Sequence, residues 1–138
     1  MELQCWVISS GHTLPKTGDV VLISEQERDL LCALSYTHLA CGQSAQSLAL
    51  LRLAVSDNSQ DVNLLRIFAY ALIAEGLGDE ALTILDRLDV LDDQQSSRVP
   101  LTLMRSHALL RARRMDEARA VFQSYVSLRS STILLKQT

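Results

Sequence analysis

The chain has 138 residues, of which 48% are hydrophobic and only 4% aromatic, and its formal net charge is −3. This length predicts one domain that can bury a hydrophobic core. An acidic chain lacks the basic surface expected of a nucleic-acid-binding protein, and no run approaches the roughly 18 apolar residues of a membrane span. We therefore expect neither nucleic-acid binding nor membrane insertion. The apolar content is mainly Leu and Ala, which favours helices and predicts an all-α fold.

Cysteine usage and the N-terminal residues predict a cytoplasmic protein. Three cysteines, Cys5, Cys32 and Cys41, form no disulfide pattern, which indicates a reducing compartment. The first residues include Glu2 and a short apolar run, unlike a signal peptide. The sequence has no phosphate-binding glycine loop and no metal-ligand motif. We therefore expect no enzymatic activity, no cofactor and no metal.

Residues 1–23 are predicted to form a flexible N-terminal arm. Gly11, Pro15 and Gly18 interrupt any helix in this segment. Two short apolar patches, at residues 3–8 and 20–23, leave two interpretations open. The segment is either a loose leader or an arm that covers an apolar groove.

Three helical pairs are predicted in residues 24–130, followed by a C-terminal tail at residues 131–138. Ser24 and Glu27 form a capping box at the start of the first helix. The first pair spans residues 24–41 and 44–55, the second 61–75 and 79–88, and the third 100–114 and 115–128. Residues 89–98 are polar and predict a solvated loop. In the first helix, the stripe expected to face the core consists of Leu30, Leu31, Leu34, His38 and Cys41.

The turns inside the pairs repeat along the chain. Gly42 and Gly76 lie 34 residues apart, and a third turn at residues 113–118 repeats the Asp-Glu-Ala of the second turn 37 residues later, without the glycine. This period predicts three tetratricopeptide-like helix-turn-helix repeats in a right-handed solenoid with a concave groove. The residues predicted to pack the repeats are the two glycines and a small residue early in each second helix: Gly42, Ser47, Gly76, Ala81 and Ala118.

In such an array the first helix of each pair lines the groove. Alignment on the turns gives nine predicted partner-binding residues: Cys32, Tyr36, Leu39, Arg66, Tyr70, Ile73, Leu103, His107 and Leu110. These residues predict a mostly apolar groove with hydroxyl groups, suited to a peptide that presents aliphatic side chains. Alternatively, the tyrosines pack between repeats. An exposed apolar groove also predicts a homodimer when no client is bound.

Three local sequences resemble the small tetratricopeptide chaperones of type III secretion systems, and among them the YscY (SctY) family. They are EQERDLL at residues 25–31, LACG at 39–42 and ARAVFQSY at 118–125. Residues 1–21 have no counterpart in this family, and the loop at 89–98 is longer than in the family. The resemblance implies a chaperone that binds an early export substrate of the YscX (SctX) type and delivers it to the export gate, YscV (SctV). Two alternatives stay open: a needle-subunit co-chaperone of the YscG type and a general tetratricopeptide adaptor.

Overall fold

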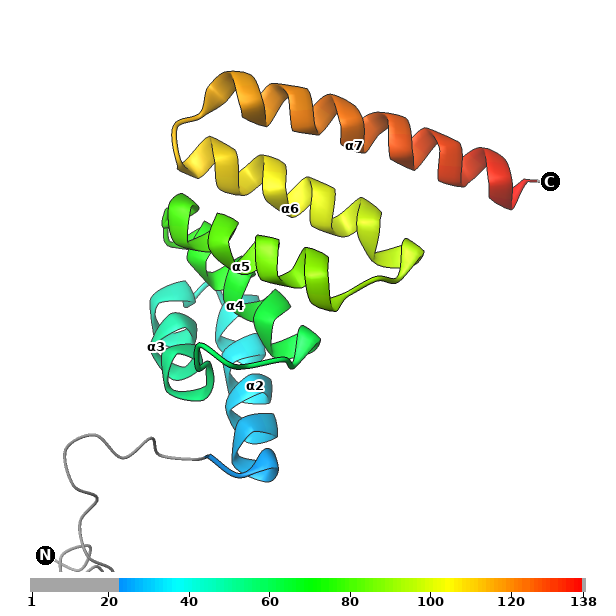
Figure 1. The fold of residues 1–138 in the computed structure, drawn as a ribbon. Coiled ribbons are helices and arrows are strands. Elements are labelled where there is room, and N and C mark those ends of the chain that lie inside the picture. The colour runs from blue at the N-terminus through cyan, green and yellow to red at the C-terminus, as the bar shows by residue number, and fades with distance from the viewer. Residues whose placement is uncertain (1–22, 138) are drawn as a thin grey trace, which may run out of the picture.

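The computed structural model of the protein describes residues 23–137, and within this range every regular element is a helix (Figure 1). The predicted all-α fold is confirmed, whereas the predicted N-terminal arm lies outside the described residues apart from Ile23. The elements are α2 (Glu25–Ala40), α3 (Ser44–Ala54), α4 (Val62–Ala74), α5 (Gly78–Leu91), the short 3-10 helix η1 (Gln95–Ser97), α6 (Arg98–Arg111) and α7 (Met115–Lys136).

The helices form three consecutive pairs that stack along one direction. Helices α2 and α3, α4 and α5, and α6 and α7 pack together within the pairs. Between pairs, α3 contacts α4 and α5 contacts α6, while the first helices contact each other from α2 to α4 and from α4 to α6. In Figure 1, α2 lies at one end of the stack and α7 at the other. The middle pair is therefore covered on both sides.

The predicted capping box at the start of α2 is confirmed. The Glu27 amide donates to Ser24 Oγ at 3.2 Å, and the Ser24 amide donates to Glu27 Oε2 at 2.9 Å. Hydrogen bonds from the Ser24 backbone and side chain hold the pKa of Glu27 below its usual value. Asp61 caps α4 in a similar way by accepting from the amides of Asn63 and Leu64.

Each pair closes through the same turn. One residue in each turn has a positive φ: Gly42 at 74°, Gly76 at 79° and Arg113 at 62°. The amide of that residue donates to the carbonyl three residues earlier, and the next amide donates to the carbonyl five residues earlier at 2.8–2.9 Å. This is the Schellman arrangement, which satisfies the carbonyls at a helix end. The third turn therefore keeps the geometry although an arginine stands where the first two turns have glycine.

Replacing this arginine tests the cost of the left-handed backbone. For a residue with a Cβ, this conformation costs about 1–2 kcal/mol, whereas glycine loses about 0.5–1 kcal/mol of entropy on folding. We expect Arg113→Gly to raise the free energy of unfolding by roughly 0.5–1 kcal/mol, measured by urea denaturation. Arg111→Gly, in the last turn of α6, is the control and should lower it. A destabilised Arg113→Gly variant would contradict this account.

Small residues lie where the two helices of each pair cross. Ser47, Ala81 and Ala118, which the sequence analysis singled out on the second helices, are all buried. Twelve residues before them, on the first helices, stand Ser35, Ala69 and Ser106, which are also buried. Ala69 was expected on the core face of its helix, whereas Ser35 and Ser106 were not predicted.

Two hydrogen bonds join these crossing points. Ser47 Oγ donates to the Ser35 carbonyl at 2.8 Å, and Ser106 Oγ donates to the Ala118 carbonyl at 3.3 Å. The three first-helix residues could have been predicted from the sequence, because they recur at the same spacings of 34 and 37 residues as the turns.

The core is centred on the middle pair. Its fully buried residues include Leu64, Leu65 and Leu72 of α4 and Leu85 and Leu88 of α5. The expectation for the first helix was partly wrong, because Cys41 is exposed, and so are Leu30 and Leu34 of α2. The two leucines lie on the side of α2 that a preceding helix would cover, and none of residues 23–137 forms such a helix.

Several boundaries differ from the prediction, and α6 ends at Arg111 rather than at residue 114. Helix α5 continues to Leu91 and α6 begins at Arg98, so the polar stretch at 89–98 is largely helical. Helix α7 continues to Lys136 rather than ending near Leu128, so residues 131–136 of the predicted tail are its last turns. The extra length carries α7 beyond the end of α6 (Figure 1).

Candidate partner-binding face

The nine predicted partner-binding residues occupy three equivalent positions on α2, α4 and α6, and we call them the first-helix face. Counted back from the positive-φ residue of each turn, the positions are ten, six and three residues earlier. The first row holds Cys32, Arg66 and Leu103, the second Tyr36, Tyr70 and His107, and the third Leu39, Ile73 and Leu110.

The second row is open along the whole stack. The exposed fraction is 64% for Tyr36 and 54% for Tyr70, and His107 is also exposed. Tyrosine side chains that pack between neighbouring helices would be covered on most of their surface. These phenol groups are therefore free to contact a partner.

The burial of the third-row residues differs from one helix to the next. Leu39 is half-buried against the core and Leu110 is exposed. Ile73 retains only 9% of its surface and belongs to the core, so its prediction as a partner-binding residue is wrong. The physical reason is the place of α4 in the middle of the stack, where it contacts both α2 and α6.

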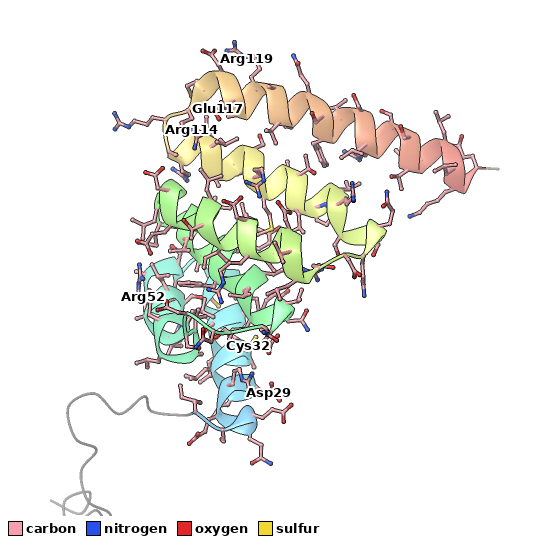
Figure 2. The ribbon with its side chains drawn as sticks, in the orientation of Figure 1. Asp29, Cys32, Arg52, Arg114, Glu117 and Arg119 are labelled. Atoms are coloured by element: carbon pink, nitrogen blue, oxygen red, sulfur yellow. The ribbon has the colours of Figure 1, made fainter. Side chains whose placement is uncertain are left out.

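In the first row, Cys32 and Leu103 are half-buried. Burial raises the pKa of the Cys32 thiol, and the nearby carboxylates of Asp61 and Asp29 raise it further. Figure 2 shows Cys32 and Asp29 on α2. A protonated, partly covered thiol is a packing group rather than a nucleophile.

Arg66 is a structural residue rather than a free cation for an acidic ligand. Its guanidinium bonds to the Asp92 carboxylate and donates to Ser97 Oγ at 2.7 Å. Only 4% of the Asp92 side chain is exposed, and Ser97 is buried. These bonds fasten the connection between α5 and α6 onto α4. The expectation of a solvated loop at residues 89–98 is therefore wrong at Asp92 and Ser97.

These contacts favour the ionised form of Asp92. Burial alone would raise the pKa of its carboxyl, but hydrogen bonds from Ser97, Arg66 and the Gln94 amide outweigh burial and lower the pKa. A carboxyl with a lowered pKa stabilises the fold above its ordinary pKa of about 3.9, and this contribution is lost as the pH falls through the folded-state value.

We therefore expect Asp92→Asn to change the pH dependence of stability. The variant should melt below the wild-type protein at pH 7, and the difference in Tm should shrink as the pH falls below about 4. Asp93→Asn, at the neighbouring exposed position, is the control. A difference between Asp92→Asn and wild type that stays constant from pH 7 to pH 3 would contradict the account.

Two shallow hollows adjoin the second row. One, of about 260 Å³, lies between α4, η1 and α6, where Tyr70 stands beside Leu101 and Met104. The other, of about 290 Å³, lies between α6 and α7, where His107 and Leu110 face Met115 and Phe122. Both combine apolar side chains with a polar ring group, a lining suited to side chains of a bound peptide.

No family model matches the chain, and no curated protein shows significant similarity to it. Among residues 23–137, no cluster of three or more His, Cys, Asp or Glu side chains is placed to hold a metal ion. In the same range, every helix is too short or too polar to cross a lipid bilayer.

Proposed function

We propose that the chain is a tetratricopeptide-type scaffold that binds a segment of another protein on its first-helix face. The observation that carries the proposal is the row of exposed ring side chains, Tyr36, Tyr70 and His107, at one position of three successive helices. Tyrosine combines a large apolar surface with a hydroxyl group and loses little conformational entropy, which makes it a frequent contact residue in interfaces.

The repeat assignment is supported by the turns and the crossing points. Tetratricopeptide repeats have a period near 34 residues, with one small residue in the first helix and an alanine in the second. Here the positive-φ residues are spaced by 34 and 37, and the buried small pairs recur with them. This regularity supports three such repeats in a right-handed solenoid, with the first helices on its concave side.

The narrower proposal is a cytoplasmic, non-catalytic type III secretion chaperone. Its client would be a small export substrate of the YscX (SctX) type, which the chaperone would deliver to the YscV (SctV) export gate. The support is the resemblance of residues 25–31, 39–42 and 118–125 together with the apolar hollows beside Tyr70 and His107. A needle-subunit co-chaperone and a general adaptor are the alternatives.

A pull-down of the tagged protein from the cytosol of its own source, followed by mass spectrometry, separates these functions. A small secretion substrate together with an export-gate component would support the chaperone proposal. A polymerising needle subunit would instead identify the co-chaperone, and recovery of unrelated proteins would leave the adaptor.

The first-helix face is tested with the double variant Tyr36→Glu/Tyr70→Glu. Two carboxylates in the exposed row should weaken binding of the captured client at least about tenfold, because central aromatic contacts dominate interface energies. Helical circular dichroism should stay unchanged, since both side chains are more than half exposed. Leu53→Glu, at an exposed position of α3, is the matched control, and equal client binding by both variants would exclude the face.

A further inference from the structure

Helix α2 lacks a neighbour that the other two first helices have. Helix α4 contacts α3 and α6 contacts α5, so each of them packs against the second helix of the preceding pair. Helix α2 belongs to the first pair, and none of residues 23–137 forms a helix before it. The side of α2 that would meet a preceding helix is therefore open.

Three residues of α6 show which side of a first helix faces the preceding pair. Leu101 lines a hollow together with Asp89 of α5, and Arg105 bonds to the Asp89 carboxylate at 2.5 Å. The Ala108 carbonyl oxygen would lie 2.5 Å from a Cβ built on Gly78, at the start of α5. Spacings of four and three residues place these three positions on one side of the helix.

The equivalent residues of α4 lie on a covered side as well. Leu64, Phe68 and Ala71 are all buried. The guanidinium carbon of Arg52 on α3 lies 5.9 Å from the centroid of the Phe68 ring, so α3 packs against this side of α4. In each repeat the three positions precede the positive-φ residue of the turn by 12, 8 and 5 residues.

On α2 the same three positions are exposed. They hold Leu30, Leu34 and Thr37, and we call these residues the α2 outer face. The exposed fractions of the two leucines are 60% and 43%. The Thr37 hydroxyl donates to the Ala33 carbonyl at 2.9 Å, so a cover would leave this donor paired. The α2 outer face is thus an apolar surface that gains from being removed from water.

The chain itself contains an apolar segment that can reach this face. Five of the six residues at 3–8 are apolar, among them Trp6, Val7 and Ile8. Residues 9–22 connect this segment to the residues that begin α2. A connection of this length can extend over roughly 46 Å. Since α2 has 16 residues and is about 24 Å long, every point on the helix lies within reach.

We propose that residues 3–8 pack on the α2 outer face of the same chain and take the place that a preceding helix takes on α4 and α6. This packing removes apolar side chains of both surfaces from water, and Trp6 is the largest of them. Gly11, Pro15 and Gly18 in the connection favour turns, which return the chain toward α2. The occupant is a part of this chain rather than a client, so the inference does not depend on the proposed function.

Attachment favours this segment over a free partner. A segment held by a short connection has an effective concentration in the millimolar range. A second copy or a client at micromolar concentration would have to bind the α2 outer face about a thousandfold more tightly to displace it. The face is therefore covered within the single chain.

The test uses Trp6, which is the only tryptophan of the chain, so that its fluorescence reports on this segment alone. We expect the folded protein to emit at shorter wavelength than the chain unfolded in guanidinium chloride, at every protein concentration. Leu30→Glu/Leu34→Glu should move the emission to that of the unfolded chain, with unchanged helical circular dichroism. Leu30→Gln/Leu34→Gln, which adds no charge, should shift it in the same direction. Leu53→Glu/Val90→Glu, at exposed positions of α3 and α5, is the matched control and should emit like the wild type.

Three results would overturn the proposal. Equal emission from the folded and the unfolded wild-type protein would mean that Trp6 stays in water. Unchanged emission in both α2 variants would assign the segment to another surface. Wild-type emission that moves to longer wavelength on dilution would show that the segment covers a second copy rather than its own chain.

Discussion

Gly78→Ala is expected to destabilise the protein by about 3 kcal/mol, the upper part of the range usual for overpacking. Gly78 is buried at the start of α5, where α6 passes closest to it. An added Cβ would lie 2.3 Å from the Ala112 nitrogen and 2.5 Å from the Ala108 oxygen. Backbone atoms cannot rotate away, so α5 and α6 would have to separate.

Gly42→Ala is the matched control for this prediction. No atom lies within 4 Å of a Cβ built on Gly42, so its cost is confined to the left-handed backbone, about 1–2 kcal/mol. Urea denaturation gives both values, and hydrogen exchange at residues 108–112 should accelerate in Gly78→Ala alone. An equal loss of stability in both variants, without faster exchange, would show that α5 and α6 tolerate the methyl group.

The need for a glycine at position 78 could not be predicted from the sequence. The period of 34 identified Gly76 as the turn residue, and its positive φ agrees with that prediction. Gly78 stands two residues later at a position that holds Ser44 in the first pair and Met115 in the third. The need for glycine there comes from the approach of α6, a contact between helices that no local pattern encodes.

The helix pairs could be predicted because each pair is formed by residues that are close together in the sequence. Three features of the sequence predicted the three pairs: the Leu and Ala periodicity, the capping box at Ser24 and the turn spacing. Most of the predicted helix boundaries lie within a few residues of the observed ones. The candidate face was predicted less well, because equal repeat positions are not equally covered. Leu39, Ile73 and Leu110 share one position, and their burial differs with the helices beside them. The bond between Arg66 and Asp92 joins residues that are 26 positions apart, and no local pattern in the chain predicts it.

Leu85→Ala and Phe122→Ala probe one repeat position in two surroundings. Leu85 is fully buried between α5 and α6, so its truncation should cost about 2–5 kcal/mol through lost burial and the cavity that remains. Phe122 leaves nearly half of its surface exposed, so its truncation should cost well under the about 3–5 kcal/mol of a buried phenylalanine. Thermal and urea denaturation of dilute protein measure both.

The comparison also reports on how far the outer side of α7 contributes to the fold. Phe122 belongs to the last pair, and none of residues 23–137 forms a helix beyond α7. A cost for Phe122→Ala as large as that for Leu85→Ala in dilute solution would mean that a single chain already buries this side chain. The outer side of α7 would then be part of the core rather than an exposed surface.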